Sequence, residues 1–280
     1  MKRHNVLSLI VAVACVVPTD SSTAFGQDVS QLKKAKDVSG LVRLLRDRDG
    51  KVRSSAAVAF SQVIREVDDE KKLSRFVLPL VDATLRDPYS TVREYAGRGL
   101  QHCLQNITDP SLLAAAVPPL VDALNATEVE KKRRKYCAVQ LSRVIPQIKH
   151  ESLLVQSMPA LLSATLDDPN EDVREYAGRA LKNALPIVRD KKVLHVGATT
   201  LAKTLQHKDT KRRQYAAVLL SWLVPKLREM DTLRAISDRV SAAAQRDRND
   251  EVREYAGRAA RNIKQELQNA VAKAVNDDVQ

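Results

Sequence analysis

The sequence predicts an all-α protein built as a solenoid of stacked helix pairs. The phrase Val-Arg-Glu-Tyr-Ala-Gly-Arg occurs at 92–98, 173–179 and 252–258, and weaker relatives of it start at 52, 133 and 212. Successive starts are therefore 40, 41, 40, 39 and 40 residues apart, and such a regular period is typical of stacked-repeat proteins. Only 8 Gly and 3 Phe occur in 280 residues, which argues against an all-β alternative.

Length and composition agree with this architecture. A chain of 280 residues could form one large domain or two ordinary ones. Each unit of a solenoid contacts only its neighbours, however, so the repeat indicates one elongated body. Hydrophobic residues make up 44% of the chain, enough for a continuous core, and only 4% of it is aromatic. The formal net charge of +12 favours partners with acidic surfaces.

Residues 1–26 have the layout of a secretory signal peptide. Two basic residues precede an apolar run at 6–17, and Ala24 and Gly26 stand at −3 and −1 of a cleavage site. The apolar run is too short to span a membrane as an ordinary helix. We therefore expect export from a bacterial cytoplasm to the periplasm or beyond, and a linker at 27–36.

Cleavage at a second place is an alternative. The segment Ala12-Val13-Ala14-Cys15 loosely resembles a bacterial lipobox, and cleavage there would leave a lipid anchor on Cys15. We expect no transmembrane span in the mature chain under either alternative.

Residues 71–108 show how one unit is organised. Apolar residues in its first half follow helical spacing, and Asp87-Pro88 then ends that helix in a turn. A second helix begins near Ser90, and its apolar residues recur so that they share one face. The first helix is marked by Phe76, Val77, Leu80, Val81, Thr84 and Leu85, and the second by Val92, Ala96, Leu100, Cys103 and Leu104.

The same organisation repeats along the chain. Prolines that recur at 79, 119 and 159 predict a bend in the first helix of their units. The first unit is shorter and more polar, as a terminal cap should be, and 271–280 is a polar C-terminal tail. The predicted units cover about 37–68, 71–108, 110–149, 151–189, 191–229 and 231–270.

A charge pattern crosses the turn of nearly every unit, because an acid stands six residues before an arginine. The fifth unit has His207 before Arg213 instead. The repeated spacing predicts a ladder of charge-assisted hydrogen bonds that links each unit to the next. Its members are Asp47 and Arg53, Asp87 and Arg93, Glu128 and Arg134, Asp168 and Arg174, and Asp247 and Arg253.

These features together resemble the HEAT repeat of armadillo-type proteins. The resemblance rests on a helix, an Asp at the turn, Val-Arg-x-x-Ala and a second helix, with a proline in the first helix, and it covers 37–270. It implies a right-handed α-solenoid whose second helices line a concave face. It also implies binding or scaffolding as the usual role.

Some proteins with HEAT-like repeats are enzymes, and we weighed two of them. Deoxyhypusine hydroxylase holds two irons with several His-Glu pairs, whereas this chain has one such dipeptide, His150-Glu151. The bilin lyases of phycobilisome assembly share the repeat, but no catalytic residue here carries their activity over. We expect no cofactor, no metal and no enzymatic activity, and keep a lyase or hydroxylase as the second alternative. Cys103 and Cys137 occupy unequal repeat positions, so we expect no disulfide between them.

Two sets of repeat positions face outward, counted from the first residue of each phrase. Position +3 holds Ser55 and then five tyrosines, which either pack against the neighbouring unit or form a strip of contact residues. Position +6 alternates between valine and arginine, and a glutamate precedes each of these arginines by four residues. The tyrosines are Tyr95, Tyr136, Tyr176, Tyr215 and Tyr255, and the arginines are Arg98, Arg179 and Arg258.

The alternation shows that the building block is a pair of units, about 80 residues long and present three times. The third and fifth units open their second helices with basic clusters, Lys131-Lys132-Arg133-Arg134-Lys135 and Lys211-Arg212-Arg213. These clusters are either a solvated rim or a stripe that attracts an acidic partner. We predict a scaffold that binds an acidic protein partner on the concave face, with Lys131, Lys132 and Lys211 among its contacts. A binder of nucleic acid or of a cell-envelope polyanion is the first alternative, and export disfavours nucleic acid.

Overall fold

The chain folds into a two-layered stack of helices. The computed structural model describes residues 21–126 and 130–277, and they form the all-α solenoid that the sequence predicts. Residues 1–20, 127–129 and 278–280 lie outside the described residues, and with them Cys15, Glu128 and most of the predicted signal peptide. Among the helices described, none is long and apolar enough to cross a membrane.

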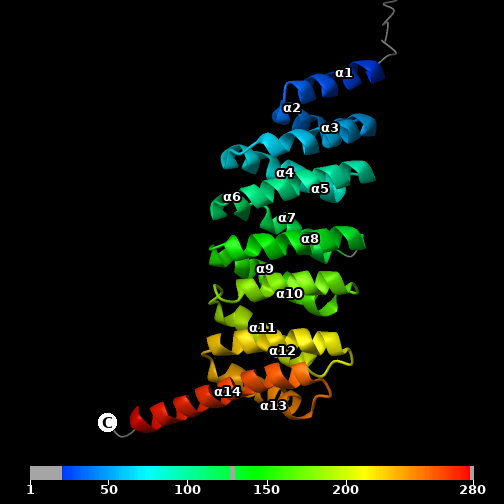
Figure 1. The fold of residues 1–280 in the computed structure, drawn as a ribbon. Helices are drawn as coiled ribbons and strands as arrows, with labels where there is room; N and C mark the ends of the chain where they lie inside the picture. The colour runs from blue at the N-terminus through cyan, green and yellow to red at the C-terminus, as the bar shows by residue number, and fades with distance from the viewer. Residues whose placement is uncertain (1–20, 127–129, 278–280) are drawn as a thin grey trace, which may run out of the picture.

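Each of the six units contributes one helix to each layer, except that the first helix of the third unit is divided in two (Figure 1). The first helices are α2 (Val38–Leu44), α4 (Glu70–Arg86), α6 (Pro110–Ala114) with α7 (Val117–Asn125), α9 (Glu151–Asp167), α11 (Lys191–Thr204) and α13 (Met230–Arg246). The second helices are α3 (Gly50–Val63), α5 (Ser90–Asn106), α8 (Lys131–Val144), α10 (Glu171–Ala184), α12 (Thr210–Leu223) and α14 (Asp250–Asp277). Short 3-10 turns, η1 (Ile64–Glu66), η2 (Ile145–Gln147) and η3 (Val224–Lys226), follow α3, α8 and α12.

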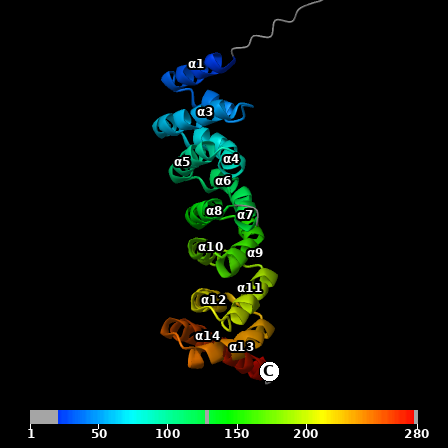
Figure 2. The same cartoon turned by 90° about the vertical axis from the view of Figure 1, so that its right-hand side faces the viewer.

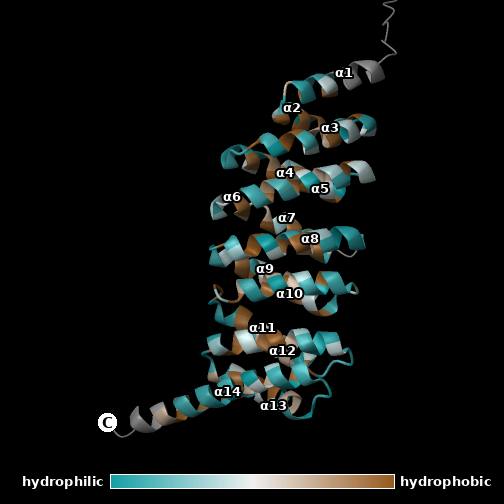
Figure 3. Cartoon of the chain, viewed as in Figure 1, coloured by the Kyte–Doolittle hydropathy of each residue, from teal (hydrophilic) through white to brown (hydrophobic). Residues whose placement is uncertain are grey.

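The two layers face opposite sides of the molecule. Figure 2 shows the second helices from α3 to α14 along one side and the first helices along the other, with a gentle bend towards the second helices. Apolar segments are spread along the whole stack, not gathered at one centre (Figure 3). This is the distribution expected when each unit buries its apolar surface against its neighbours alone.

Both ends of the solenoid contain more helix than the sequence predicts. The segment expected to be a linker, 27–36, lies largely in α1 (Ser21–Lys34), where Val29 is buried and Leu32 packs against the core. The expected tail from residue 271 begins within α14, which runs on to Asp277 and projects beyond the stack (Figure 1). The tail was expected from its polarity, which does not exclude a helix.

The recurring prolines have unequal effects. Pro79 and Pro159 lie inside continuous helices, α4 and α9. In the third unit the first helix is divided between Ala114 and Val117, just before the tandem Pro118-Pro119. Two successive prolines remove two backbone donors, so one helical turn cannot form its usual hydrogen bonds there.

Side-chain caps begin many of the helices. The carboxylates of Asp49, Asp69, Asp190 and Asp209 each accept a backbone N–H from the first turn of the helix that follows. Such N-caps satisfy amides that have no partner within the helix. They fix where the turn ends and the helix begins.

The core consists of small and branched side chains in register. Position +4 of every second helix is fully buried, at Ala56, Ala96, Cys137, Ala177, Ala216 and Ala256. Cys103 and Cys137 are both free and buried, and burial raises the pKa of each thiol to about 12. Both cysteines therefore serve as small core residues, not as reactive thiols.

An ion pair joins the two units within each pair. Arg53 reaches Asp87 (Nε to Oδ2, 2.7 Å), and the same contact recurs at 2.7 Å in the other two pairs. These side chains are nearly buried, with 12–14% exposure for the arginines and 6% for the aspartates. Each aspartate also caps its own turn, as Asp87 does for the amide of Tyr89 (2.8 Å). The other two contacts join Arg134 to Asp168 and Arg213 to Asp247.

The ladder therefore differs from the expected pairing. Arg53 and Arg213 donate to the backbone carbonyl of the residue six positions earlier, as Arg53 does to Asp47 at 2.9 Å, and the carboxylate partner of each stands 34 residues later. His207 serves Arg213 equally well through its carbonyl oxygen (2.9 Å), which explains why this position does not need an acid. Arg93, Arg174 and Arg253 make the same carbonyl contact within their own units.

Successive pairs meet through a different junction. The ring of Tyr136 lies against Gly97, and its hydroxyl donates to the Gly97 carbonyl oxygen at 2.9 Å. A Cβ atom at Gly97 would stand 3.5 Å from that ring, in van der Waals contact, and 3.3 Å from Cγ2 of Thr84. Arg133 also donates from Nη1 to the carbonyl oxygen of Leu85 at 2.6 Å. Nearly buried arginine–aspartate pairs thus join the units within each pair, whereas a tyrosine stands against a glycine between pairs, alongside the more exposed ion pairs of Arg93 with Glu130 and of Arg212 with Asp167.

Candidate functional site

The second-helix face carries most of the residues that the sequence singles out. Tyr95, Tyr176 and Tyr255 are each covered by the arginine three residues later, with the guanidinium carbon 4.6–5.1 Å from the ring centre. Each of these arginines, Arg98, Arg179 and Arg258, also pairs with the glutamate four residues before it. These outward arginines therefore lie over tyrosine rings, where cation–π contacts are worth about 0.5–1 kcal/mol at exposed sites.

The remaining two tyrosines occupy the junctions between pairs, and they differ from each other. Burial raises the pKa of Tyr136, whose hydroxyl is held by Gly97. Tyr215 lies near Gly178 but does not make the corresponding hydrogen bond to it, and instead lines an open pocket. Burial, Glu175 and Glu171 raise the pKa of Tyr215. The five tyrosines therefore do not form one uniform contact strip.

The basic clusters are largely engaged in holding the solenoid together. Arg133 and Arg212 reach back to the preceding pair, to Leu85 and Asp167, and Arg134 and Arg213 form the ion pairs within pairs. Lys135 pairs with Asp172 at 2.9 Å. Three exposed lysines make no ion pair with any described residue, and these are Lys131, Lys132 and Lys211.

A pocket of about 250 Å³ opens between α10 and α12. Lys182, Lys211 and Arg179 stand around it, and Tyr215, Val218 and Leu219 provide its apolar wall. Its two acids are already engaged, because Glu175 pairs with Arg179 and Glu251 accepts from Gln214 at 2.7 Å. Lys182 and Lys211 form no ion pair within the described residues, so the pocket combines an apolar wall with two available cations.

Trp222 extends this surface, and sequence reasoning missed it. It stands four residues after Val218 and seven after Tyr215, hence on the same side of α12. Its residue surface is 47% exposed, and Lys182 Nζ lies 4.5 Å from its ring centre. It is the only tryptophan in the sequence. The sequence could have pointed to Trp222 only because it departs from the repeat, since the equivalent position one pair earlier holds Arg143.

The histidines and acids do not gather into a metal centre. Within the described ranges no three His, Cys, Asp or Glu side chains lie close enough to hold an ion. Glu151 of the His150-Glu151 dipeptide accepts the backbone N–H of Arg189 at 2.5 Å, as Glu70 accepts that of Thr108 at 2.9 Å. The glutamate of the dipeptide thus ties one unit to the junction that follows it.

Solved structures with the same architecture include designed and natural repeat proteins. A designed armadillo repeat protein matches with a TM-score of 0.52 and 16% identity, over 81% of this chain and 99% of its own. An archaeal HEAT-like repeats protein from Thermococcus onnurineus NA1 matches with a TM-score of 0.54 and 17% identity, over 88% and 94%. An engineered protein matches with a TM-score of 0.55 and 22% identity, over 82% and 97%.

These likenesses show the HEAT- and armadillo-type solenoid fold. No family model matches the sequence, and no curated protein matches it closely.

Proposed function

We propose that this solenoid is a protein-binding scaffold that holds an acidic segment of its partner on the second-helix face. A general binding or scaffolding role agrees with the fold. One observation carries the finer proposal: a half-exposed tryptophan, Trp222, adjoins a pocket with an apolar wall and two unpaired lysines. Tryptophan is among the residues that dominate binding energy at interfaces, especially beside a pocket that excludes water.

The charges around the pocket indicate the chemistry of the partner. Lys182 and Lys211 supply positive charge at its rim, and neither forms an ion pair with a described residue. A partner segment that offers a carboxylate to them and an aliphatic or aromatic side chain to Val218 and Trp222 would satisfy both features. Complementary charge of this kind steers association and fixes orientation.

Selection from a random displayed peptide library tests this proposal directly. We expect enrichment of peptides that combine acidic residues with one large apolar residue. Their affinity should fall about thirtyfold in Trp222→Ala, since a central aromatic anchor contributes about 2 kcal/mol. The matched control is Leu78→Ala, which removes a 52% exposed apolar side chain from α4 in the other layer.

Two outcomes would contradict the proposal. In one, the selected peptides bind Trp222→Ala and wild type equally while both proteins unfold at the same temperature. In the other, only polyanions such as heparin are retained, with an affinity that falls steeply with salt. That second result would favour the polyanion-binding alternative, through Lys131, Lys132 and Lys211.

We also propose that the mature protein works outside the cytoplasm. Cleavage after Gly26 would retain Val29 and Leu32, which pack against the first unit. The intact mass of the protein from its natural host tests this proposal. We expect a mature chain that begins at Gln27, and a lipid-modified chain that begins at Cys15 would favour the lipoprotein alternative. An uncleaved chain would contradict both.

A further inference from the structure

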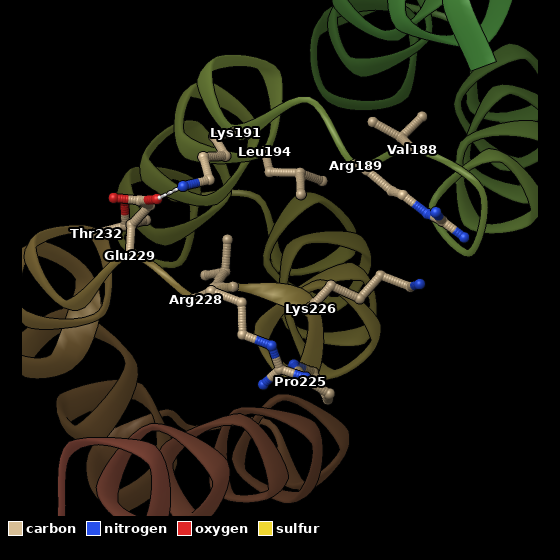
Figure 4. A pocket seen from close by; sticks show the side chains of 10 residues that line it. Val188, Arg189, Lys191, Leu194, Pro225, Lys226, Arg228, Glu229 and Thr232 are labelled. Atoms are coloured by element: carbon tan, nitrogen blue, oxygen red, sulfur yellow. Dashed lines mark ion pairs between the residues drawn. The ribbon is translucent and has the colours of Figure 1, made fainter. Parts of the chain in front are cut away.

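A second hollow, of about 390 Å³, lies just beyond the C-terminal end of α12. Pro225, which lines it, is ten residues beyond Tyr215 of the pocket between α10 and α12, or roughly 15 Å along the helix axis, and it follows Trp222 by three residues. The hollow is enclosed by the chain that leaves the fourth unit, the chain that leaves the fifth, and the starts of α11 and α13 (Figure 4). Its polar lining consists of Arg189, Lys191, Lys226, Arg228, Glu229 and Thr232.

Positive charge exceeds negative charge around this hollow. Lys191 pairs with Glu229 at 2.7 Å, and Arg228 lies 3.5 Å from Glu266. Lys226 donates only to the backbone carbonyl oxygen of Pro186 (2.9 Å), and Arg189 makes no ion pair with any described residue. The lining itself holds four cations and one acid, Glu229, and Glu266 and Glu151 stand outside it, against Arg228 and the amide of Arg189. In Figure 4, Arg189 and Lys226 extend towards the same end of the hollow.

The preceding repeat pair supplies an internal comparison for this site. The positions of Arg189, Lys191 and Lys226 are occupied there by Thr108, Pro110 and Gln147. The amide of Thr108 nevertheless donates to Glu70 there, as the amide of Arg189 donates to Glu151 here. This hydrogen bond between the junction and the preceding helix therefore forms without the three cations.

The first repeat pair strengthens this comparison. The positions of Lys226, Arg228 and Glu229 carry Glu66, Asp68 and Asp69 there. The same edge of the solenoid thus changes from acidic at its N-terminal end to basic at its C-terminal end. The last such junction combines a hollow with a surplus of cations.

We propose that this hollow binds a small anion that carries two or more phosphate groups. Arg189 and Arg228 provide planar guanidinium groups, whose paired N–H donors match two oxygens of one phosphate. Lys191 and Lys226 add point charges at separate places on the wall, which suits a ligand with more than one charged group. The volume exceeds what one phosphate ion fills, and binding would relieve the mutual repulsion of the unpaired cations.

Isothermal titration calorimetry with pyrophosphate, at fixed ionic strength, tests the proposal. We expect one saturable site in wild type and tighter binding of pyrophosphate than of citrate, which carries carboxylates instead. The variant Arg189→Thr/Lys226→Gln installs the residues of the preceding pair, and its affinity should fall about a hundredfold, since each lost charge-assisted bond costs about tenfold or more. The matched control, Lys131→Gln/Lys132→Gln, removes two charges elsewhere and should bind as wild type does.

A reciprocal graft keeps the proposal falsifiable if the loss variant proves unstable. Thr108→Arg/Gln147→Lys places two cations in the preceding junction and should add a second equivalent of bound pyrophosphate. Absence of saturable binding to wild type would overturn the proposal. Equal loss of affinity in the Lys131/Lys132 control would show diffuse attraction and no site, and equal binding of citrate would overturn the assignment to phosphate. Failure of the graft would overturn the role given to these two side chains.

Discussion

Replacing Asp247 by Asn lowers the stability of the last repeat pair by about 3 kcal/mol, because a nearly buried ion pair loses one partner. Arg213 donates to both oxygens of Asp247, at 2.7 and 3.1 Å, and only 13% of the arginine side chain is exposed. Asparagine keeps an oxygen for the amide of Asn249, so the cap of the turn survives and the lost charge is isolated. Urea unfolding and hydrogen exchange of α13 and α14 measure the change.

The pH dependence of this effect has a defined sign. Burial alone would raise the pKa of Asp247, but hydrogen bonds from Arg213 and the Asn249 amide hold it below its ordinary value of 3.8. A carboxylate with a lowered pKa stabilises the fold above that value, and the contribution is lost as the pH falls through the folded-state pKa. The difference between wild type and Asp247→Asn should therefore shrink below about pH 4.

Asp231 provides the control for this prediction. It pairs with Arg234 at 3.4 Å, but its side chain is 96% exposed. Exposed pairs contribute at most about 1 kcal/mol, so Asp231→Asn should change stability little at any pH. An Asp247→Asn variant as stable as Asp231→Asn would contradict the structural role given to the ladder.

Replacing Tyr136 by Ala costs about 3 kcal/mol of folding stability, at the low end of the range for truncating a packed aromatic ring. The ring fills the space left by Gly97 and its hydroxyl is bonded at 2.9 Å, so both packing and a hydrogen bond are lost. Tyr136→Phe separates the two contributions and should cost about 1 kcal/mol. Urea unfolding monitored by circular dichroism measures both variants.

Tyr215→Ala is the matched comparison, since Tyr215 holds the same repeat position one pair later. It lines the pocket between α10 and α12 and lacks the bond to the glycine carbonyl. We expect a smaller loss of stability and a clear loss of affinity for the selected peptides. Equal destabilisation by both alanine variants would show that the two junctions are equivalent and that Tyr215 is no contact residue.

The repeat made the fold predictable, because the same apolar spacing occurs in every unit. Val92, Ala96 and Leu100 lie one turn apart, and the same phase recurs in every unit, so the buried face follows from spacing alone. The acid–arginine pattern was recognised, but its partners were assigned wrongly. The six-residue spacing within one unit corresponds to the contact of Arg53 with the backbone carbonyl of Asp47. The ion pair of Arg53 with the Asp87 carboxylate depends instead on how two units stack, which the spacing does not contain.

The candidate sites were harder to predict, for the same reason. Comparing the same position in successive units selects residues that repeat. The tyrosines at position +3 and the arginines at position +6 were selected in this way, and they proved to be partly structural. Trp222 and Arg189 occur once at their positions, so periodicity gave no reason to select them. Comparison of equivalent junctions, such as Thr108 with Arg189, identifies what one copy has acquired beyond the shared architecture.

The alternation of junctions also determines how such a protein can change its length. Gly97 accommodates the ring of Tyr136, while the equivalent residue of the first unit, Ala57, carries a methyl group. Deleting the second unit would bring Ala57 against that ring and would remove Asp87, the carboxylate that Arg53 needs. Removing or inserting two units preserves both kinds of junction. A change of length by a whole 80-residue pair therefore leaves every junction of this solenoid as it is.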